Sequence, residues 1–181
     1  VYPEYPNTFW SFKHALKFVQ KGAAYPPLGL LTVAAMLPED WNLKLIDLNT
    51  ARLKKKSIEW ADLCFISAMS IQEQSVKEIS AMCVQAGKKI VAGGPLFSAN
   101  LDNYTDIDYL VLDEAENTLP EFLSDLKAGH PKRVYRSKDW PDITETPIPK
   151  WDLIDTDDYV CMSIQYSRGC PFNCEFCDIV S

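Results

Sequence analysis

The sequence predicts an α/β fold built on a parallel, doubly wound sheet, and two observations support this prediction. Short apolar runs alternate with helical patterns in the order strand, helix, strand, helix. This order implies right-handed crossovers, which make neighbouring strands parallel. In addition, residues 61–68 are apolar almost without interruption, which is typical of a strand that helices cover on both faces.

Strands are expected at residues 43–49, 62–68, 89–93 and 108–112, each followed by polar or turn-forming residues. Residues 1–3 are typical of the end of a further strand. The sheet is therefore expected either to start with a clipped strand or to have a very short first one. Residues 9–19 indicate a helical, aromatic-rich loop.

Helices are expected at residues 28–37, 71–87 and 118–128. The first is apolar nearly all round and ends before Pro38, so it should be well buried. The second begins with Ser70-Ile71-Gln72-Glu73, which has the form of a capping box, and ends at Gly87. The third begins at Thr118 and ends at Gly129.

Composition limits the class of protein. With 181 residues, 47% hydrophobic and 24% charged, the chain has the size of one globular domain, or of one domain and part of another. A net charge of −7 argues against nonspecific nucleic-acid binding, and the basic run at residues 54–56 is expected to be a solvated loop or helix end. No apolar stretch reaches the ~18 residues of a membrane span, and residues 1–6 contain no secretory signal. A cytoplasmic protein is therefore expected.

Residues 131–158 are predicted to be a linker, because four prolines and many charges replace the periodic patterns. Residues 159–166 then alternate like a new strand, and a cysteine-rich loop follows. The sequence thus predicts three parts: a Rossmann-like domain at residues 1–130, the linker at 131–158, and at 159–181 the truncated start of a second domain.

Three of the six cysteines, Cys64, Cys83 and Cys161, stand alone among apolar residues. A free cysteine behaves as a small hydrophobic residue, so all three are expected in the core.

The other three, Cys170, Cys174 and Cys177, have the spacing C-x₃-C-x₂-C. In a reducing compartment clustered cysteines bind metal more often than they pair. Three thiolates can hold three irons of a cubane cluster and leave the fourth iron open. A zinc site would need a fourth ligand or water, and neither His14 nor His130 has a suitable spacing. An iron–sulfur cluster, a zinc ion and an incidental grouping stay open on the spacing alone.

The cysteine loop closely resembles that of the radical S-adenosylmethionine (SAM) enzymes. An aromatic residue, Phe176, precedes the last cysteine, and Ser167-Arg168-Gly169 precedes the first. The resemblance implies a [4Fe–4S] cluster bound by Cys170, Cys174 and Cys177. Its open iron would hold the amino and carboxylate groups of SAM, and Phe176 would lie near the adenine.

The preceding sequence resembles the cobalamin-binding domain of cobalamin-dependent radical SAM enzymes, especially the branch with hopanoid methylases. The order and spacing of short pieces carry this resemblance, at residues 27–30, 45–49, 66–69, 92–95, 114–116, 149–153 and 165–179. In open α/β sheets ligands bind outside the carboxyl ends of the strands, although a glycine pair alone is also typical of a plain turn. The expected cofactor-binding residues are therefore Asn49, Ser67, Ala68, Met69, Gly93, Gly94, Pro95, Glu114, Ala115 and Glu116.

One departure from the family concerns cobalt. Cobalamin domains that ligate cobalt from below use a D-x-H-x-x-G motif, and here Asn49 stands where the histidine would be. We therefore expect no histidine ligand, and a lower cobalt face that meets water or the side chains near residues 67–69 and 7–12. Asn49 could instead simply cap a turn. His14 is a conceivable substitute ligand, but an ordinary surface histidine is the stronger expectation.

The resemblance implies an enzyme in the intact protein, a methyltransferase acting on an unactivated carbon. A 5′-deoxyadenosyl radical would take hydrogen from that carbon, and methylcobalamin would donate the methyl group. The alternatives are a cobalamin-dependent radical SAM cyclase or rearrangement enzyme, and a cobalamin carrier module. Expected partners are a small-molecule substrate, which can be lipid-like, and an electron donor such as flavodoxin or ferredoxin. The chain alone is expected to be inactive.

Overall fold

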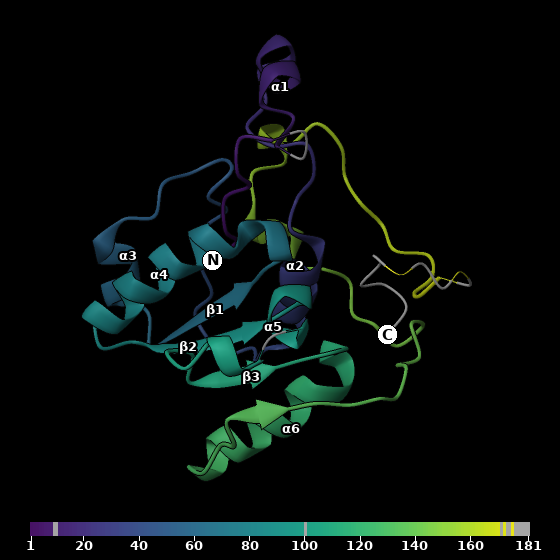
Figure 1. Cartoon of the computed structure of the whole chain (residues 1–181). Helices are drawn as coiled ribbons and strands as arrows, with labels where there is room; N and C mark the ends of the chain where they lie inside the picture. Colours follow the sequence, from purple (N-terminus) through teal and green to yellow (C-terminus); the bar gives the residue numbers. More distant parts are fainter. Residues whose placement is uncertain (9–10, 100, 171, 173–174, 176–181) are drawn as a thin grey trace.

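A computed structural model describes residues 1–8, 11–99, 101–170, 172 and 175, and its centre is a parallel sheet (Figure 1). The described strands follow one another in the order β1-β2-β3-β4. Their bounds are Leu63–Ser67, Lys89–Gly93, Tyr109–Val111 and Val134–Tyr135. All three pairings between them are parallel. The predicted α/β fold with a parallel sheet is thus confirmed.

The helices are α1 (Lys13–Val19), α2 (Leu28–Met36), α3 (Lys55–Trp60), α4 (Glu73–Gln85), α5 (Pro95–Ala99) and α6 (Ala115–Ala128). Short 3₁₀ turns lie at Ser70–Gln72, Leu101–Asn103, Trp151–Leu153 and Thr156–Asp158. The three predicted helices correspond to α2, α4 and α6. Among the described residues, no helix combines the length and the apolar character that crossing a membrane requires.

The sheet has a separate core on each face, as a doubly wound fold requires. On one face Cys64 and Ile66 of β1 pack with Val76 and Ile79 of α4. On the other face the neighbouring residues of β1 pack toward α2 and α6, where Phe122 is fully buried. Cys64 and Cys83 are buried as predicted.

The predicted strand at residues 43–49 is not formed. These residues, all of which the structure describes, have one strand-type pairing, an isolated parallel bridge between Tyr2 and Asp47 that lies outside the four-stranded sheet. The amide of Tyr2 donates to the carbonyl of Ile46 at 2.9 Å, and the amide of Leu48 donates to the carbonyl of Tyr2 at 2.9 Å. Tyr2 is thus the one residue of 1–3 with a strand-type pairing, and a single bridge is too short to order the whole of 43–49.

The predicted strand at residues 159–166 is likewise not formed. It makes one parallel bridge, between Ala23 and Tyr159, and Cys161 adds a backbone hydrogen bond to Ala24. The expectation that Cys161 is a core residue is wrong, because its thiol is exposed. The alternating pattern has no further described strand to pair with, and Ile164 and Tyr166 are each 91% exposed.

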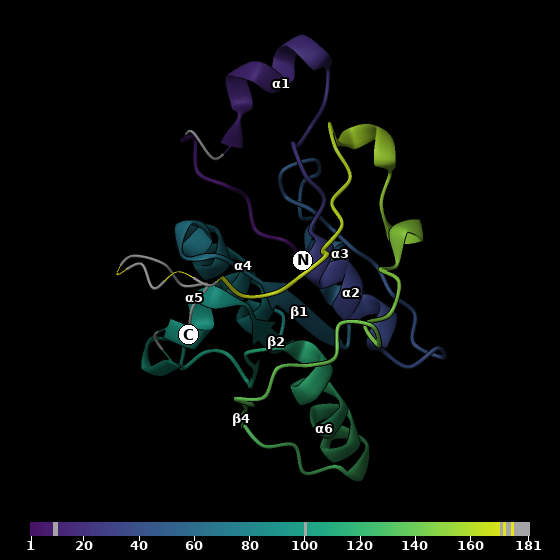
Figure 2. The same ribbon diagram turned by 90° about the vertical axis from the view of Figure 1, so that its right-hand side faces the viewer.

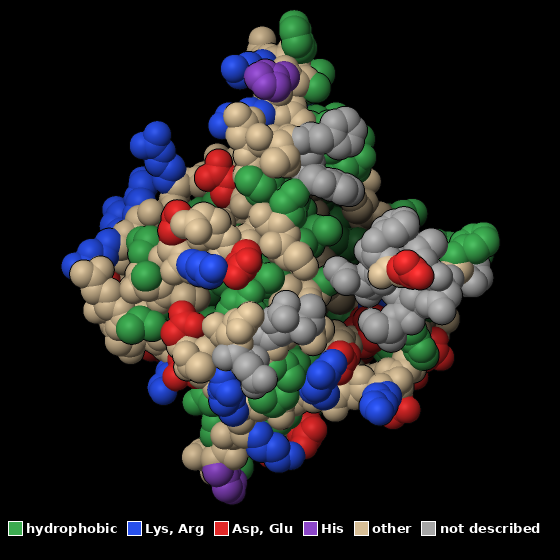
Figure 3. Space-filling view, viewed as in Figure 1, with side chains coloured by type: hydrophobic (Ala, Val, Ile, Leu, Met, Phe, Trp, Pro, Cys, Tyr) green, Lys and Arg blue, Asp and Glu red, His purple; other side chains and the backbone are tan. Residues whose placement is uncertain are grey.

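Two helix starts differ from the prediction. Helix α6 begins at Ala115 rather than Thr118, because the buried Thr118 hydroxyl donates to the carbonyl of Leu112 at 3.1 Å instead of capping amides. At the start of α4 the Gln72 side chain, not Ser70, accepts a hydrogen bond from the amide of Met69 at 3.0 Å. The lysines at residues 54–56 are exposed at the start of α3, as expected for a solvated helix end (Figure 3).

Candidate functional site

The predicted cofactor-binding residues gather where the strands end. The carboxyl ends of β1, β2 and β3 point to the same side of the sheet, the right-hand side in Figure 1. The amide of Ala68 donates to the carbonyl of Gly93 at 3.2 Å, and the amide of Leu96 donates to the carbonyl of Ala68 at 3.1 Å. The structure therefore brings residues 67–69 and 93–95 together, and we call this side the carboxyl edge.

The glycine pair of this edge is needed for the approach of neighbouring strand ends. A Cβ atom on Gly93 would lie 2.5 Å from the carbonyl oxygen of Val111. A Cβ atom on Gly94, whose φ is +95°, would lie 2.9 Å from the carbonyl oxygen of Ala68. Both contacts are with backbone that cannot move without disturbing the sheet. The pair thus has a structural role whether or not a ligand also approaches it.

Asn49 lies at the same edge with its side chain fully engaged. Its Nδ2 donates to Asp47 Oδ1 at 2.6 Å and to the carbonyl of Pro3 at 3.3 Å. Its Oδ1 accepts a hydrogen bond from the amide of Tyr5 at 2.9 Å. Asn49 therefore organises the loop after residues 43–48 and ties residues 3–5 to it.

Residues 3–5 extend the carboxyl edge. The buried side-chain Nε2 of Gln72 donates to the carbonyl of Pro3 at 2.6 Å, and the Tyr5 hydroxyl contacts the sulfur of Met69 at 3.6 Å. Met69 is 42% exposed, so it is an apolar side chain of this edge that a ligand can reach. No local sequence pattern indicates a role for Tyr5, because its contacts depend on how distant segments pack.

Asp47 links the edge to the segment that follows the linker. It is buried, and its Oδ2 accepts a hydrogen bond from the hydroxyl of Tyr159 at 3.0 Å. Burial raises the pKa of Asp47, although the hydrogen bonds from Asn49 and Tyr159 oppose this effect. Residue 159 is thereby fixed beside the strand ends.

Glu114 and Glu116 are bound by Arg168, the arginine two positions before Cys170. Arg168 Nη1 lies 2.5 Å from Glu114 Oε2 and 3.0 Å from Glu116 Oε2, and Nη2 pairs with Glu116 Oε1. The side chains of Arg168 and Glu116 are only 11% and 13% exposed. Glu116 also accepts a hydrogen bond from Thr146 of the linker at 2.9 Å. We call this group of four residues the arginine clamp.

The electrostatics of the clamp favour the ionised carboxylate. Burial by itself would raise the pKa of Glu116, but the hydrogen bonds from Arg168 and Thr146 outweigh it and lower the pKa below its usual value. The clamp and the Tyr159 contact fix the two ends of residues 159–168. In Figures 1 and 2 this segment runs past the carboxyl ends of the strands.

The predicted cluster ligands are described only in part. Cys170 carries an exposed free thiol. Cys174, Cys177 and Phe176 lie outside the described residues. Sequence analysis singled out Arg168 only as part of the motif before Cys170, and its pairing with Glu116, 52 residues away, was not predicted.

The described residues of the carboxyl edge present backbone groups and one accessible apolar side chain. Of the described side chains at this edge, Met69 is accessible to a ligand. The Asn49 side chain is hydrogen-bonded within the protein, and Glu114 and Glu116 are paired with Arg168. His14 is exposed on α1, which stands away from the sheet at the top of Figures 1 and 3. The nominated residues therefore offer no imidazole to a metal.

Residues 19–123 match the family of B12 binding domains. The chain is 42% identical over 182 aligned residues to an uncharacterized methyltransferase of Synechocystis sp. (strain PCC 6803), covering 99% of this chain and 34% of that protein. It is 37% identical to the hopanoid C-2 methylase of Rhodopseudomonas palustris (strain TIE-1), covering 99% and 35%. It is 28% identical to the bacteriochlorophyllide d C-8(2)-methyltransferase of Chlorobaculum tepidum, covering 87% and 36%.

No solved structure matches the chain significantly. The chain spans about a third of the length of these relatives. The family match covers more than half of the chain and includes β1, β2 and β3 with the strand ends that form the carboxyl edge. The chain belongs to the B12-binding domain family.

Proposed function

We propose that the protein containing this chain is a cobalamin-dependent radical SAM methyltransferase that methylates an unactivated carbon of a small molecule. The observation that carries the proposal is the sequence of parts: a B12-binding domain, a linker, and then the C-x₃-C-x₂-C loop at residues 170–177. The names of the relatives, a hopanoid C-2 methylase and a bacteriochlorophyllide methyltransferase, support it. When bound, a [4Fe–4S] cluster with SAM would supply a 5′-deoxyadenosyl radical, and methylcobalamin would supply the methyl group.

In this proposal residues 1–130 hold cobalamin at the carboxyl edge, residues 131–158 are a linker, and residues 159–181 begin the radical SAM domain. The backbone at residues 67–69 and 93–95 and the Met69 side chain would contact the corrin. Cys170, Cys174 and Cys177 would bind the cluster, which a flavodoxin or ferredoxin would reduce. The arginine clamp would hold the start of the cysteine loop, just before Cys170, beside the cobalamin site.

The proposal is tested on the intact protein after anaerobic reconstitution with iron and sulfide. Incubation with SAM carrying a trideuterated methyl group, cobalamin and a lipid extract as substrate source should give 5′-deoxyadenosine and a product heavier by the labelled methyl group. A Cys170→Ala variant is the control and should lose both. A product with no label, formed together with 5′-deoxyadenosine, would indicate a cyclase or rearrangement enzyme instead.

The coordination of cobalt gives a second test, which the chain itself allows. Asn49 stands at the position of the ligating histidine, and both its Oδ1 and its Nδ2 already make hydrogen bonds within the protein. The protein should therefore give no nitrogen ligand to bound Co(II). Electron paramagnetic resonance of the Co(II) form should therefore show no superhyperfine splitting that depends on a protein nitrogen. A nitrogen splitting that disappears in His14→Ala would contradict this account. Absence of cobalamin binding would reject the site itself.

A further inference from the structure

Residues 113–117, which directly follow β3, bind the linker and the segment before the cysteine loop at the same time. We call these residues the acidic turn. Asp113 Oδ1 pairs with Arg136 Nη2 at 3.1 Å, and Asn117 Nδ2 donates to the carbonyl of Asp139 at 2.6 Å. These two contacts attach the linker to both ends of the turn, and Glu114 and Glu116 of the arginine clamp lie between them. Three parts of the chain therefore meet at this turn.

The linker holds the backbone of the acidic turn in a sparsely populated conformation. Asp113 has a φ of +60°, in the left-handed region that few residues other than glycine adopt. The amide of Ser137 donates to Asp113 Oδ2 at 3.2 Å, and Arg136 donates to the same carboxylate. Because Glu114 is the next residue along the chain, a change in the shape of this turn would also move the clamp.

Residues 159–168 depend on the acidic turn for their second attachment. Tyr159 is held by Asp47 at one end, and the described backbone hydrogen bonds from this segment to the rest of the chain end at Cys161. Beyond that point Tyr166 is 91% exposed, and the clamp holds Arg168. Opening of the clamp would therefore free everything after Cys161 from the sheet.

The cysteine loop begins directly at the clamp. Gly169 separates Arg168 from Cys170, and a Cβ atom on Gly169 would lie 3.5 Å from the ring of Trp140 in the linker. Trp140 follows Asp139, whose carbonyl the acidic turn binds. The start of the loop is thus held by the turn in two ways, through Arg168 and through the linker.

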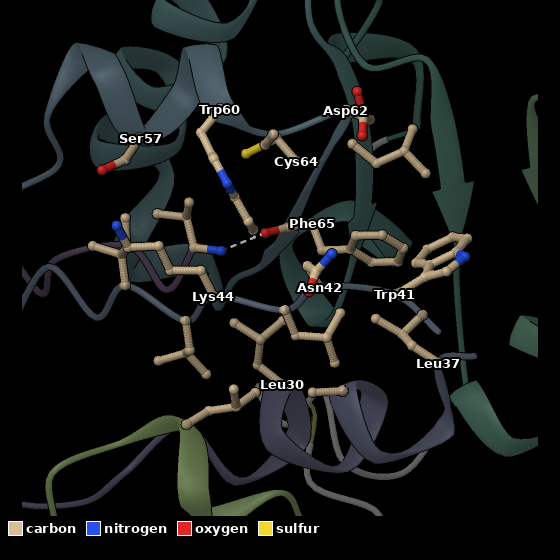
Figure 4. Close-up of a pocket in the computed structure, with 18 of the residues that line it drawn as sticks. Leu30, Leu37, Trp41, Asn42, Lys44, Ser57, Trp60, Asp62, Cys64 and Phe65 are labelled. Carbon is tan, nitrogen blue, oxygen red and sulfur yellow. Dashed lines mark hydrogen bonds between the residues drawn. The ribbon is translucent and has the colours of Figure 1, made fainter. Parts of the chain in front are cut away.

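The cavity shown in Figure 4 is a different place. It has a volume of about 550 Å³ and lies beside β1, at the opposite end of the strand order from β4. Leu30, Leu37 and Trp60 are among its described lining residues, and the four residues of the clamp are not. A ligand that contacts the acidic turn therefore has to lie at the carboxyl edge rather than in this cavity.

We propose that the acidic turn couples ligand binding at the carboxyl edge to the attachment of the cysteine loop, with Arg168 as the positioning residue. The inference rests on the proposed cobalamin site, for which residues 114–116 are predicted contacts. Cobalamin beside the turn would hold it in the shape that the closed clamp requires, so residues 159–168 would detach less often. Coupling between two equilibria is reciprocal, so the closed clamp must in turn strengthen the binding of cobalamin.

The test uses residues 1–181 and hydroxocobalamin, and it needs neither a cluster nor catalytic activity. Chymotrypsin cleaves after tyrosine, and its active site takes up several residues on both sides of the bond, so cleavage after Tyr166 requires the segment to detach. When detachment is fast, the cleavage rate follows the population of the detached form. Mass spectrometry follows peptides that end at Tyr166, with and without saturating hydroxocobalamin. A spectrophotometric titration gives the dissociation constant of hydroxocobalamin for each variant.

Hydroxocobalamin should slow cleavage after Tyr166 by about tenfold in the unmodified chain. Arg168→Ala should be cleaved rapidly whether or not hydroxocobalamin is present, and its dissociation constant should rise by about the same factor. Arg168→Lys keeps the charge and should restore part of both effects. Thr146→Val removes only the hydrogen bond from the linker to Glu116 and should give a smaller change in the same direction.

Lys132→Ala is the matched control, because it removes an ion pair between Lys132 and Glu121 of α6 that lies outside the acidic turn. It should behave like the unmodified chain in both measurements. If hydroxocobalamin binds but leaves cleavage unchanged, or binds equally well to Arg168→Ala, the coupling is refuted and the proposed function stands. Faster cleavage on binding would also refute it, because the ligand would then displace the segment. A chain that does not bind hydroxocobalamin would reject the proposed cobalamin site together with the coupling.

Discussion

Gly93→Ala should lower the free energy of unfolding by about 3 kcal/mol, the cost of overpacking between two rigid backbones. The new Cβ atom would lie 2.5 Å from the carbonyl oxygen of Val111, so β2 and β3 would have to separate where Ala92 pairs with Leu110. The change adds a single methyl group and no charge. Urea unfolding followed by circular dichroism measures the difference.

Gly87→Ala is the matched control. Gly87 has a φ of +65°, but a Cβ atom there would have no neighbour within 4 Å. Its substitution should cost about 1–2 kcal/mol from the left-handed backbone alone. If Gly93→Ala costs no more than Gly87→Ala, the strand ends can adjust, and the glycine pair would be needed for a ligand rather than for the sheet.

The elements that the sequence predicted correctly are those specified by local patterns. The strands predicted at residues 62–68 and 89–93 are present as Leu63–Ser67 and Lys89–Gly93, and α4 follows the apolar stripe of Val76, Ile79 and Cys83. Residues 43–49 failed for a non-local reason, because a strand also needs a neighbour, and residues 1–2 provide only a short one. The two-residue strand β4 lies inside the predicted linker, where its pairing with β3 rather than any periodicity forms it.

The sequence allowed the location of the candidate site to be predicted, but not the long-range side-chain contacts within it. Parallel strands end at one edge, so residues 67–69 and 93–95 could be expected together, and the structure joins them by hydrogen bonds. The roles of Tyr159 and Arg168 could not be predicted, because they contact Asp47 and Glu116 over separations of 112 and 52 residues. Nothing local in the sequence determines which distant carboxylate such a side chain meets.

Disrupting the arginine clamp should have the second large effect. Arg168→Ala removes the cation that compensates Glu116, whose side chain is only 13% exposed, and leaves two carboxylates side by side. Removing one partner of a largely buried pair is costly, so a cycle of Arg168→Ala and Glu116→Ala should give a coupling energy of about 2 kcal/mol. Hydrogen exchange at residues 159–169 is measured alongside, because this segment can detach before the sheet unfolds.

The chain provides a matched control in the pair of Arg136 and Asp113, which also joins residues after β4 to the end of β3. Its side chains are 47% and 24% exposed, and Arg136 Nη2 lies 3.1 Å from Asp113 Oδ1. An exposed pair of this kind should give a coupling energy of only about 0.2–1 kcal/mol. Equal coupling in the two cycles would show that burial does not strengthen the clamp.

The coupling in the clamp should also depend on pH in one direction. The pKa of folded Glu116 lies below its usual value because Arg168 and Thr146 outweigh the effect of burial. A carboxyl group of this kind contributes its full stabilisation above its unfolded pKa of about 4.3, and the contribution is lost as the pH falls through the lower folded value. The coupling between Arg168 and Glu116 should therefore be constant from pH 8 to about pH 5 and decline only in more acidic solution. A coupling that already disappears between pH 7 and pH 5 would mean that Glu116 is not held ionised by Arg168.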